Sequence, residues 1–424
     1  MSEDTCEGGV QDDSGVFTWR DTCRVCGGGE LVKFLDLGML PLVNRYLRSE
    51  DEGEPRFPLE IMFCRSCANS QLSGVVDPTV LYGEYDYHSS ISGTFRRHCE
   101  SMARQLGDSL PLGNEDLIVE IASNDGCLLG CFKDLGCRVL GVEPARNLAD
   151  LANRSGLQTL NRFWGTDVAE SIRQTHGSAR LVVATNVLAH VDELRGFLDA
   201  VASVLALDGV FVFEVPYMVN FINRAEFDTA YHEHLSYFLL RPLDRALRAS
   251  GLRMTDVQEF DIHGGSIRVI ARPAVVDCDP GPEVGRLLAW EEGLGLYEAG
   301  SYLRFAAHVA TLREELCAFL HGVKQRGKRI AAYGASAKGN VLLNFCALGR
   351  EVLDYVVDDT PAKQGKFYPG VRLPIVGRQE LGLHSPDYLL LLAWNFVDEL
   401  MANTHDYRQR GGRYIVPIPS LRLI

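Results

Sequence analysis

Short apolar runs alternate with amphipathic stretches along the middle of the chain. Continuous apolar runs, typical of strands buried on both faces, lie at 117–121, 138–142, 181–184 and 209–215. Segments with helical spacing lie between them at 127–135 and 148–155, and another precedes them at 91–106. This alternation predicts a parallel sheet that helices cover on both faces.

A second, smaller α/β unit is predicted in the last third of the chain. Two strands, at 253–260 and 266–271, close the first unit and are near enough in sequence to pair antiparallel. A Pro- and Asp-rich break at 273–282 then indicates a linker. Beyond it, the pattern predicts one long helix and three strands, at 302–325, 329–333, 352–357 and 388–392.

Composition narrows the classes of protein that fit this pattern. Of the 424 residues, 46% are hydrophobic and 23% are charged, which excludes a wholly disordered chain. The 42 Lys and Arg against 56 Asp and Glu give a net charge of −14, which disfavours nucleic acid as a partner. No apolar run approaches the roughly 20 residues that span a bilayer. The N-terminus also lacks the features of a signal peptide. We therefore expect a cytoplasmic protein without a membrane partner, and a monomer.

Four of the twelve cysteines form two C-x-x-C pairs in the N-terminal part. The 37 residues between the pairs hold short extended runs and turns, with too few apolar residues for a core of their own. In a reducing compartment, paired C-x-x-C motifs indicate a metal rather than disulfides. Four thiolates match a closed structural zinc site, and the predicted ligands are Cys23, Cys26, Cys64 and Cys67.

The turn after the first predicted strand indicates the class of cofactor. The turn reads Glu-Ile-Ala-Ser-Asn-Asp-Gly over 120–126, and Glu143-Pro144 ends the next strand. Ligands of such sheets bind at the carboxyl ends of the strands, where Glu143 can accept the two ribose hydroxyls. The turn lacks the glycines that let a pyrophosphate approach, and its acids favour a cation. S-adenosylmethionine carries a sulfonium, an ammonium and no phosphate, so we predict this cofactor over NAD; a turn without ligand is the alternative.

A second motif supplies groups for acid–base chemistry. Tyr231-His-Glu-His234 places a phenol, two imidazoles and a carboxylate within four residues, and His190 follows the strand ending at Ala184. Such a set provides a general base and donors for an oxyanion. His190 should lie over the same sheet edge as the cofactor. A metal bound by His232 and His234 is the alternative, although no further acid or cysteine lies at ligand spacing.

The second α/β unit has a glycine turn of its own. Gly334-Ala-Ser-Ala-Lys-Gly-Asn340 follows a predicted strand. Small residues let backbone amides face a ligand, and Lys338 can pair with a phosphate. The turn is a candidate pyrophosphate cradle for a nucleotide sugar, with a simple tight turn onto a helix as the alternative.

Taken together, these motifs resemble the S-adenosylmethionine-dependent C-methyltransferases that act on dTDP-linked 4-keto-deoxysugars in antibiotic biosynthesis. The resemblance covers nearly the whole chain from Cys23 on. Besides the cysteine pairs and both turns, it rests on Tyr-His-Glu-His-Leu-Ser-Tyr-Phe at 231–238, His-Gly-Gly-Ser-Ile-Arg at 263–268 and Leu-Ala-Trp-Asn-Phe at 392–396. Ala122 stands where this family often has Gly, a small departure that leaves the cofactor prediction intact.

The resemblance implies an α/β fold in three parts. A small N-terminal zinc-binding domain precedes a Rossmann-like methyltransferase domain that binds S-adenosylmethionine, and a second Rossmann-like domain completes the sugar-nucleotide site. The boundaries we expect are an acidic tail at 1–22 and domains at 23–88, 89–275 and 276–424.

The resemblance also implies a mechanism. A C4 ketone acidifies the neighbouring C–H, a base removes that proton, and the resulting enolate carbon takes the methyl group, at C3 or C5 with C3 favoured. The expected base is His234, with Tyr231 and His190 as donors to the enolate oxygen and Glu233 orienting an imidazole or holding the sugar.

Cofactor and substrate contacts complete the predicted site. The predicted cofactor-binding residues are Glu120, Ala122, Ser123, Asn124, Asp125, Gly126, Glu143, Pro144 and Asn186. The predicted substrate-binding residues are Tyr85, Tyr87, His263, Ser336, Lys338, Asn340 and Asn395.

Three other functions fit parts of the sequence. A small-molecule O- or N-methyltransferase needs a base but no oxyanion donors. A non-catalytic scaffold should lack the general base, yet Tyr231, Glu233 and His234 are present. A NAD-dependent sugar dehydrogenase or epimerase is disfavoured by the missing glycine fingerprint.

Overall fold

The computed structural model describes residues 15–83, 85, 88–261, 264–276 and 278–424. Its largest sheet has seven strands in the order β12(Leu252–Phe260), β13(Ser266–Pro273), β10(Leu205–Pro216), β9(Ala179–Thr185), β6(Leu117–Ile121), β7(Arg138–Val142) and β8(Thr159–Leu160). The strands from β10 to β8 run parallel, and β13 and β12 add an antiparallel edge. The predicted parallel sheet and its antiparallel pair are therefore confirmed.

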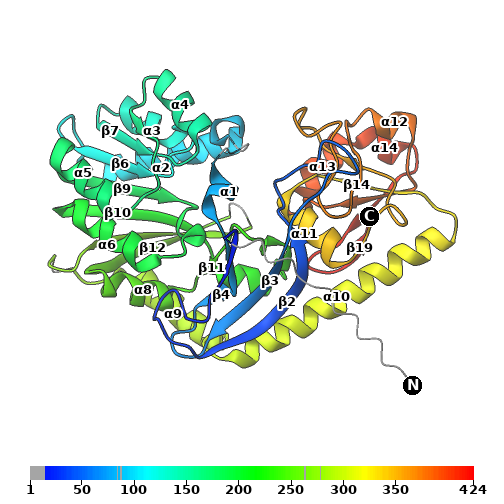
Figure 1. The fold of residues 1–424 in the computed structure, drawn as a ribbon, viewed down its shortest axis with the longest axis horizontal. Helices are drawn as coiled ribbons and strands as arrows, with labels where there is room; N and C mark the ends of the chain where they lie inside the picture. Colours follow the sequence, from blue (N-terminus) through cyan, green and yellow to red (C-terminus); the bar gives the residue numbers. More distant parts are fainter. Residues whose placement is uncertain (1–14, 84, 86–87, 262–263, 277) are drawn as a thin grey trace.

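Helices cover both faces of this sheet (Figure 1). They are α2(Gly93–Ser109), α3(Cys127–Asp134), α4(Arg146–Arg154), α5(Thr166–His176), α6(Leu194–Val204) and α8(Leu240–Ala249). All five residues of β6 are buried, as expected of a central parallel strand. The connections before and between the strands of this sheet contain four short helical elements: η1(Ser89–Ile91), η2(Leu188–His190), α7(Met218–Asn223) and η3(Phe227–Thr229).

The N-terminal part forms a four-stranded antiparallel sheet. Its order is β11(Ser236–Tyr237), β4(Ser70–Leu72), β3(Arg56–Cys64) and β2(Leu31–Pro41). A ribbon of β1(Phe17–Trp19) and β5(Gly74–Val76) and the helix α1(Pro78–Tyr82) complete it. The edge strand β11 comes from the 231–238 motif, so the sheet joins segments far apart in sequence.

The N-terminal sheet shares its core with the rest of the molecule. Phe34 of β2 and Phe63 of β3 pack on Tyr302 of the long helix α10(Ala299–Gln325), with ring centroids 5.0 and 4.4 Å apart. The apolar side chains of these strands belong to the large core cluster that extends into both other parts. This agrees with the small number of apolar residues that the sequence offers this module.

The C-terminal part is a second α/β unit. Its sheet has the order β16(Ile375–Val376), β15(Val356–Val357), β14(Ile330–Tyr333), β17(Tyr388–Leu391), β18(Arg413–Val416) and β19(Arg422–Leu423). All neighbours run parallel except β19. Its helices are α11(Ala337–Phe345), α12(Glu380–Leu383), α13(Val397–Asn403) and α14(His405–Gln409), with the turn η4(Trp394–Phe396). The helix α9(Pro282–Gly293) instead packs against β12 and α8 of the larger unit. The strand expected at 352–357 is shorter than predicted, because only its last two residues pair with β14.

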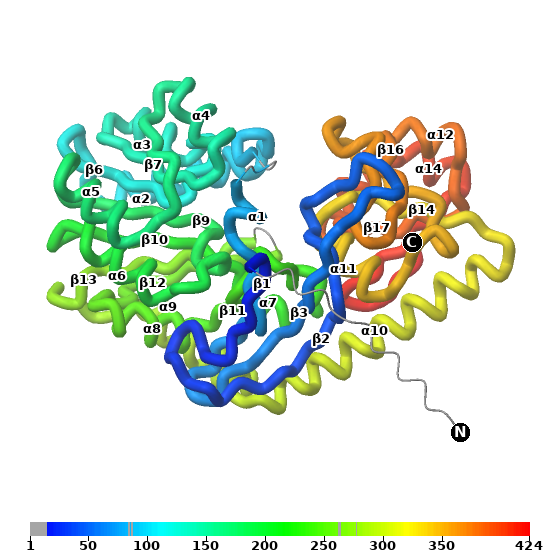
Figure 2. Tube along the Cα trace, in the orientation of Figure 1, coloured from blue at the N-terminus to red at the C-terminus, as the bar shows by residue number. Residues whose placement is uncertain are grey.

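The two α/β units lie on opposite sides of the N-terminal sheet, and α10 runs beneath them (Figure 1). The trace in Figure 2 shows the connection between β2 and β3 reaching the C-terminal unit. In the described part of the chain, no helix is both long enough and apolar enough to cross a bilayer.

Candidate active site

The four predicted zinc ligands come together in the N-terminal part. The Sγ atoms of Cys23, Cys26, Cys64 and Cys67 all lie within 4.8 Å of one another. Tight turns hold each pair, since Gly27 and Ala68 donate their backbone N–H to the carbonyls of the first cysteine of each pair. Four converging thiols are the donor set of a closed structural zinc site.

The described ranges contain no other group of three or more possible metal ligands this close together. His232, Glu233 and His234 therefore form no such cluster. His232 instead points its Nε2 at the Phe57 carbonyl, 3.2 Å away, and is buried against the N-terminal sheet.

A strained turn joins β6 to α3 at the predicted cofactor site. Ala122, Asn124 and Gly126 have positive φ angles of 52°, 52° and 82°. The Glu143 carboxylate, from the end of β7, accepts the backbone N–H of Asn124 and of Ala145, each at 2.8 Å. These two bonds fix both the acid and the turn at the carboxyl edge of the sheet.

This turn leaves buried polar atoms without a partner. The atoms are Glu120 Oε2, Ser123 Oγ and Asp125 Oδ1. Burial, followed by the nearby Cys127 thiolate, raises the pKa of Glu120 well above its ordinary value, and burial raises the pKa of Glu143. Among the described residues, these acids and this hydroxyl have no cationic side chain beside them as a partner. They suit a ligand that brings N–H groups, O–H groups and positive charge, as S-adenosylmethionine does.

Two other predicted cofactor residues lie at the same edge. Asn186 follows β9 with a φ of 57° and donates its backbone N–H to the Glu214 carbonyl. The Pro144 carbonyl accepts the side-chain amide of Asn161 at 2.8 Å. Direct contacts of these residues with the cofactor stay predictions.

The predicted catalytic side chains converge beside this edge. The rings of His234 and Tyr231 have centroids 4.0 Å apart, and His190 lies edge-on to His234 at 5.0 Å. His234 Nδ1 lies 2.9 Å from the Thr229 carbonyl oxygen. Since a carbonyl only accepts, Nδ1 carries the proton of the neutral ring and Nε2 its lone pair.

His190 is neutral and is held by a tyrosine. Burial lowers its pKa to about 4, and the Tyr82 hydroxyl lies 2.8 Å from its Nδ1. The same hydroxyl is 3.4 Å from the Glu233 carbonyl oxygen. Burial, with the nearby Glu233 charge, raises the pKa of Tyr82 well above its ordinary value, so the phenol keeps its proton.

The Glu233 carboxylate is held by two donors from the N-terminal part. Asn44 Nδ2 donates to Oε1 at 2.6 Å, and the Tyr85 hydroxyl donates to Oε2 at 3.0 Å. The side chain is buried, and burial raises its pKa. Both carboxylate oxygens therefore have fixed directions.

The turn at the C-terminal sheet is arranged differently. Ser336 Oγ caps α11 by accepting the Gly339 N–H, and the buried Asn340 amide donates to the Pro369 carbonyl at 2.9 Å. Lys338 Nζ is buried 5.0 Å from the centre of the Trp394 ring and has no hydrogen-bond partner. Asn395 is half-buried in η4. Contacts of these four residues with a substrate stay predictions, and Tyr87 and His263 lie outside the described residues.

Comparison with known proteins identifies the family. A family profile described as "C-methyltransferase C-terminal domain" matches residues 261–419, a zinc-binding domain profile matches 23–82, and a methyltransferase domain profile matches 94–257. The C-methyltransferase NovU of Streptomyces niveus is 41% identical over 406 residues, which cover 95% of this chain and 97% of NovU. The chain belongs to the C-methyltransferase family.

Solved structures match part of this C-methyltransferase. Magnesium protoporphyrin IX methyltransferase of Synechocystis PCC 6803, solved with bound SAM, has a TM-score of 0.32 and 14% identity over 42% of this chain and 78% of its own. The methyltransferase CcbJ of Streptomyces caelestis has a TM-score of 0.33 and 14% identity, and the match covers 42% of this chain and 89% of CcbJ. The family profiles and the similarity to NovU, not these partial matches, identify the protein as an S-adenosylmethionine-dependent C-methyltransferase with a zinc-binding domain, as the sequence predicted.

Sequence reasoning missed two side chains of this C-methyltransferase site. Tyr82 begins the aromatic stretch 82–88, whose composition was a usable signal. Asn44 lies in an unremarkable polar connection, and nothing in the sequence links it to Glu233.

Proposed function

We propose that this enzyme methylates a dTDP-linked 4-keto-deoxysugar at the carbon next to the ketone, with C3 favoured. One observation carries the proposal. A neutral His190, the phenols of Tyr82 and Tyr231 and the imidazole of His234, whose Nδ1 faces the Thr229 carbonyl, lie against one another. Such a group of neutral donors and one base suits deprotonation next to a carbonyl.

His234 is the base of this mechanism. The bond from its Nδ1 to the Thr229 carbonyl orients Nε2, which takes the proton from the acidic C–H. Transfer of the proton leaves the imidazolium stabilised by that same carbonyl. Packing against Tyr231 limits rotation of the ring.

His190 and Tyr231 stabilise the oxygen that becomes negative. When the Tyr82 hydroxyl donates to His190 Nδ1, the N–H of the neutral ring is on Nε2 and can donate to the enolate oxygen. Half-buried donors that are already oriented interact strongly with developing charge. Glu233, fixed by Asn44 and Tyr85, holds a hydroxyl or amino group of the sugar.

S-adenosylmethionine, when bound, supplies an electrophilic methyl group on a sulfonium, which the nucleophilic carbon of the sugar takes up. The residues that hold it are the turn residues 120–126 with Glu143, Pro144 and Asn186. Glu120 Oε2 and Asp125 Oδ1, which have no protein partner, would be the acceptors for its N–H and O–H groups, and desolvation of the two reactants would contribute to the rate.

The nucleotide part of the substrate lies against the C-terminal unit in this proposal. Ser336, Asn340 and Asn395 border its site, and Lys338 turns away from Trp394 to reach a phosphate. We also propose that the enzyme works as a monomer in the cytoplasm. Light scattering behind size-exclusion chromatography tests the monomer.

Incubation in heavy water tests the reaction. The enzyme is mixed with S-adenosylmethionine and dTDP-4-keto-2,6-dideoxysugars, with and without a 3-amino group, and products are analysed by mass spectrometry and NMR. The expected product gains one methyl group on the carbon beside C4. Without cofactor, the same carbon should take up deuterium in the wild type and in the exposed control His321→Ala, but not in His234→Ala.

Other outcomes separate the alternatives. Deuterium uptake without methylation would keep the enolisation step and reject the sugars tested. Bound cofactor with neither exchange nor methylation would overturn the proposal in favour of a small-molecule O- or N-methyltransferase.

A further inference from the structure

The connection between β2 and β3, residues 42–55, joins the candidate active site to the C-terminal unit. We call it the bridging segment. It leaves the N-terminal sheet and lies against the C-terminal unit (Figure 2). Leu47 forms an antiparallel bridge with Phe367, through N–H···O bonds of 3.0 and 2.8 Å.

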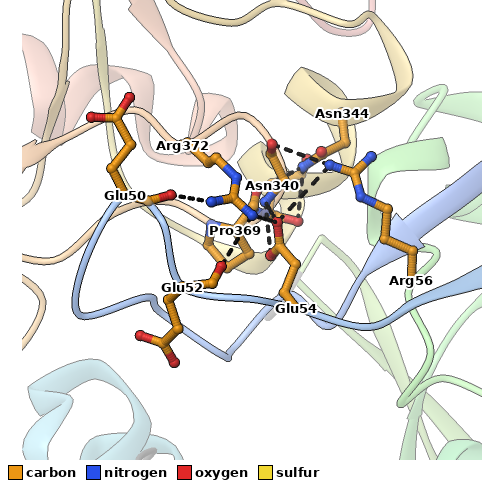
Figure 3. A network of polar contacts seen from close by, with 9 residues as sticks. Glu50, Glu52, Glu54, Arg56, Asn340, Asn344, Pro369 and Arg372 are labelled. Atoms are coloured by element: carbon orange, nitrogen blue, oxygen red, sulfur yellow. Dashed lines mark hydrogen bonds and ion pairs between the residues drawn. The ribbon is translucent and has the colours of Figure 1, made fainter.

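The far end of the bridging segment is anchored by a polar network (Figure 3). Both Glu54 carboxylate oxygens accept the Gly370 N–H at 3.0 Å, and Arg372 donates to the Glu52 carbonyl at 3.0 Å. Gly370 has a φ of 79°, and a Cβ there would collide with Asn344, so this approach requires glycine. The anchor fixes the segment on the C-terminal unit.

The near end of the segment contacts the glycine turn. The Tyr46 hydroxyl donates to the Ala335 carbonyl at 2.7 Å, inside the turn 334–340. Its ring stacks on Tyr368, which donates to the Ser336 carbonyl, and Lys363 Nζ lies 5.3 Å from the centre of the Tyr46 ring. Tyr46 is therefore bound to two consecutive residues of the turn, directly and through Tyr368.

Two residues earlier, the segment contacts the catalytic motif. Asn44 donates to Glu233 Oε1 at 2.6 Å, although Asn44 itself is exposed and Glu233 is buried. Only Arg45 separates the group that holds Glu233 from the group that holds the glycine turn. A displacement of Ala335 therefore reaches the carboxylate through one short, anchored stretch of backbone.

We propose that Asn44 and Tyr46 are positioning residues that couple the glycine turn 334–340 to the orientation of the Glu233 carboxylate. The inference rests on the proposed function, since it takes the turn as the place where the nucleotide binds. Binding energy from the non-reacting nucleotide is then used to orient a group at the reacting sugar, where small displacements change the rate strongly.

Kinetics of three variants test this coupling. Tyr46→Phe removes only the hydroxyl, and Asn44→Leu removes the amide at similar volume. Each should lower kcat about 10-fold, because each breaks one hydrogen bond of the link that orients the Glu233 carboxylate, with less than about a 2-fold change in KM for the sugar nucleotide. The double variant should be no slower than Asn44→Leu alone, because both changes break one link.

A matched control removes the same kind of tyrosine–carbonyl hydrogen bond at a position away from the glycine turn. Tyr355 also donates its hydroxyl to a carbonyl of the C-terminal unit, that of His384 at 2.7 Å, and Tyr355→Phe should keep wild-type kcat. Wild-type kcat in Tyr46→Phe, or effects of the two variants that multiply, would overturn the coupling.

Hydrogen exchange with dTDP separates this inference from the proposed function. The nucleotide should slow amide exchange at 231–234 in the wild type, and Tyr46→Phe should bind it equally well without that protection. Normal binding with unchanged protection in the variant would overturn the coupling alone. Failure of dTDP to bind the wild type would overturn both proposals.

Discussion

Two turns of this protein have the same local architecture and different surroundings. The turn 122–126 leads from β6 into α3, and the turn 334–336 leads from β14 into α11. At the first, the buried atoms Ser123 Oγ and Asp125 Oδ1 of the turn and Glu120 Oε2 of the adjoining strand β6 have no hydrogen-bond partner. In the second, the Ala335 carbonyl accepts both Tyr46 and Lys363 at 2.7 Å, and the Ala335 N–H donates to Asp358.

The difference shows that a strand–turn–helix motif does not by itself define a ligand site. Buried polar atoms need partners, and those left without a protein partner are suited to a ligand. The first turn has such atoms, as expected of a site that binds a cofactor. In the second, the Ala335 carbonyl accepts Tyr46 from the N-terminal part as well as Lys363 from its own unit, which makes the turn a contact between domains as well as a candidate substrate site. The neighbouring Lys338 Nζ is a buried polar atom without a partner there.

Removal of zinc should give the largest difference between the two turns: it should impair the contacts of the second turn and leave cofactor binding at the first almost unchanged. Structural zinc contributes on the order of 10 kcal/mol, comparable to the whole net stability of a domain. Without zinc the N-terminal sheet should no longer hold Tyr46 and Asn44 in their contacts with Ala335 and Glu233. The rate of methyl transfer should therefore fall at least about 100-fold. The first turn belongs to another sheet, so the Kd for S-adenosylmethionine should change less than about 3-fold.

Cys64→Ser, with zinc measured by mass spectrometry and cofactor binding by calorimetry, checks this expectation. Simultaneous loss of zinc and of cofactor binding would contradict the independence of the two turns. Cys137→Ser, at a buried cysteine outside the metal cluster, is the control.

One substitution at each turn should affect a different property, cofactor affinity at the first turn and stability at the second. Glu143→Ala removes two charge-assisted bonds to backbone amides and should raise the Kd for S-adenosylmethionine about 100-fold. Ser336→Ala removes the cap of α11 and should cost about 1 kcal/mol of stability without changing that Kd. Calorimetry and thermal unfolding measure both, and a weaker cofactor affinity in Ser336→Ala would refute the distinction.

The pH dependence of stability should expose the charges beside the second turn. Burial, partly opposed by Lys338, raises the pKa of Glu226 to about 7, with Asp228, Arg224 and Asp261 also nearby. From about pH 4.5 to 7 the folded state keeps a proton that the unfolded chain releases, so the free energy of unfolding falls as pH rises. Glu226→Gln should therefore be about 3 kcal/mol more stable than the wild type at pH 8 and equal at pH 4.

Urea unfolding at both pH values measures this difference. Glu399→Gln, at an exposed carboxylate of α13, should match the wild type throughout. An equal stability of Glu226→Gln and the wild type at pH 8 would contradict the assignment.

The smallest expected effect comes from the indole near the second turn. Trp394 Nε1 donates to the buried Asp228 carboxylate at 2.7 Å, next to the Thr229 carbonyl that orients His234. Trp394→Phe keeps a ring beside Lys338 and should lower kcat only about 3-fold, as expected for one indirect hydrogen bond. Trp164→Phe, which removes a bond from Trp164 to the Phe197 carbonyl, should leave kcat unchanged. Steady-state kinetics checks both.

Local patterns predicted the parts of this molecule that depend on neighbours in sequence. The apolar runs at β6, β7, β9 and β10 identified the parallel sheet, because strands buried on both faces must be apolar throughout. The C-x-x-C pairs identified the metal cluster, and the acidic turn identified the class of cofactor. The short β15 was overestimated, because the apolar residues before it pack in the core without pairing.

Contacts between distant segments could not be read from these patterns. The motif 231–238 supplies β11 to the N-terminal sheet, and only this pairing brings Tyr82, Tyr85 and Asn44 around Glu233. No local pattern indicates that Lys338 lies beside Trp394 and near Glu226 and Asp228. Its contact with a phosphate stays a prediction.

The sequence by itself thus determined the strands, the cysteine cluster and the class of cofactor, since each is encoded within a few residues by periodicity or side-chain chemistry. The tertiary structure decided which hydrogen-bond partners each of these groups meets. Those partners follow from the packing of three parts around a shared core, a sum of many weak contacts that no single motif records.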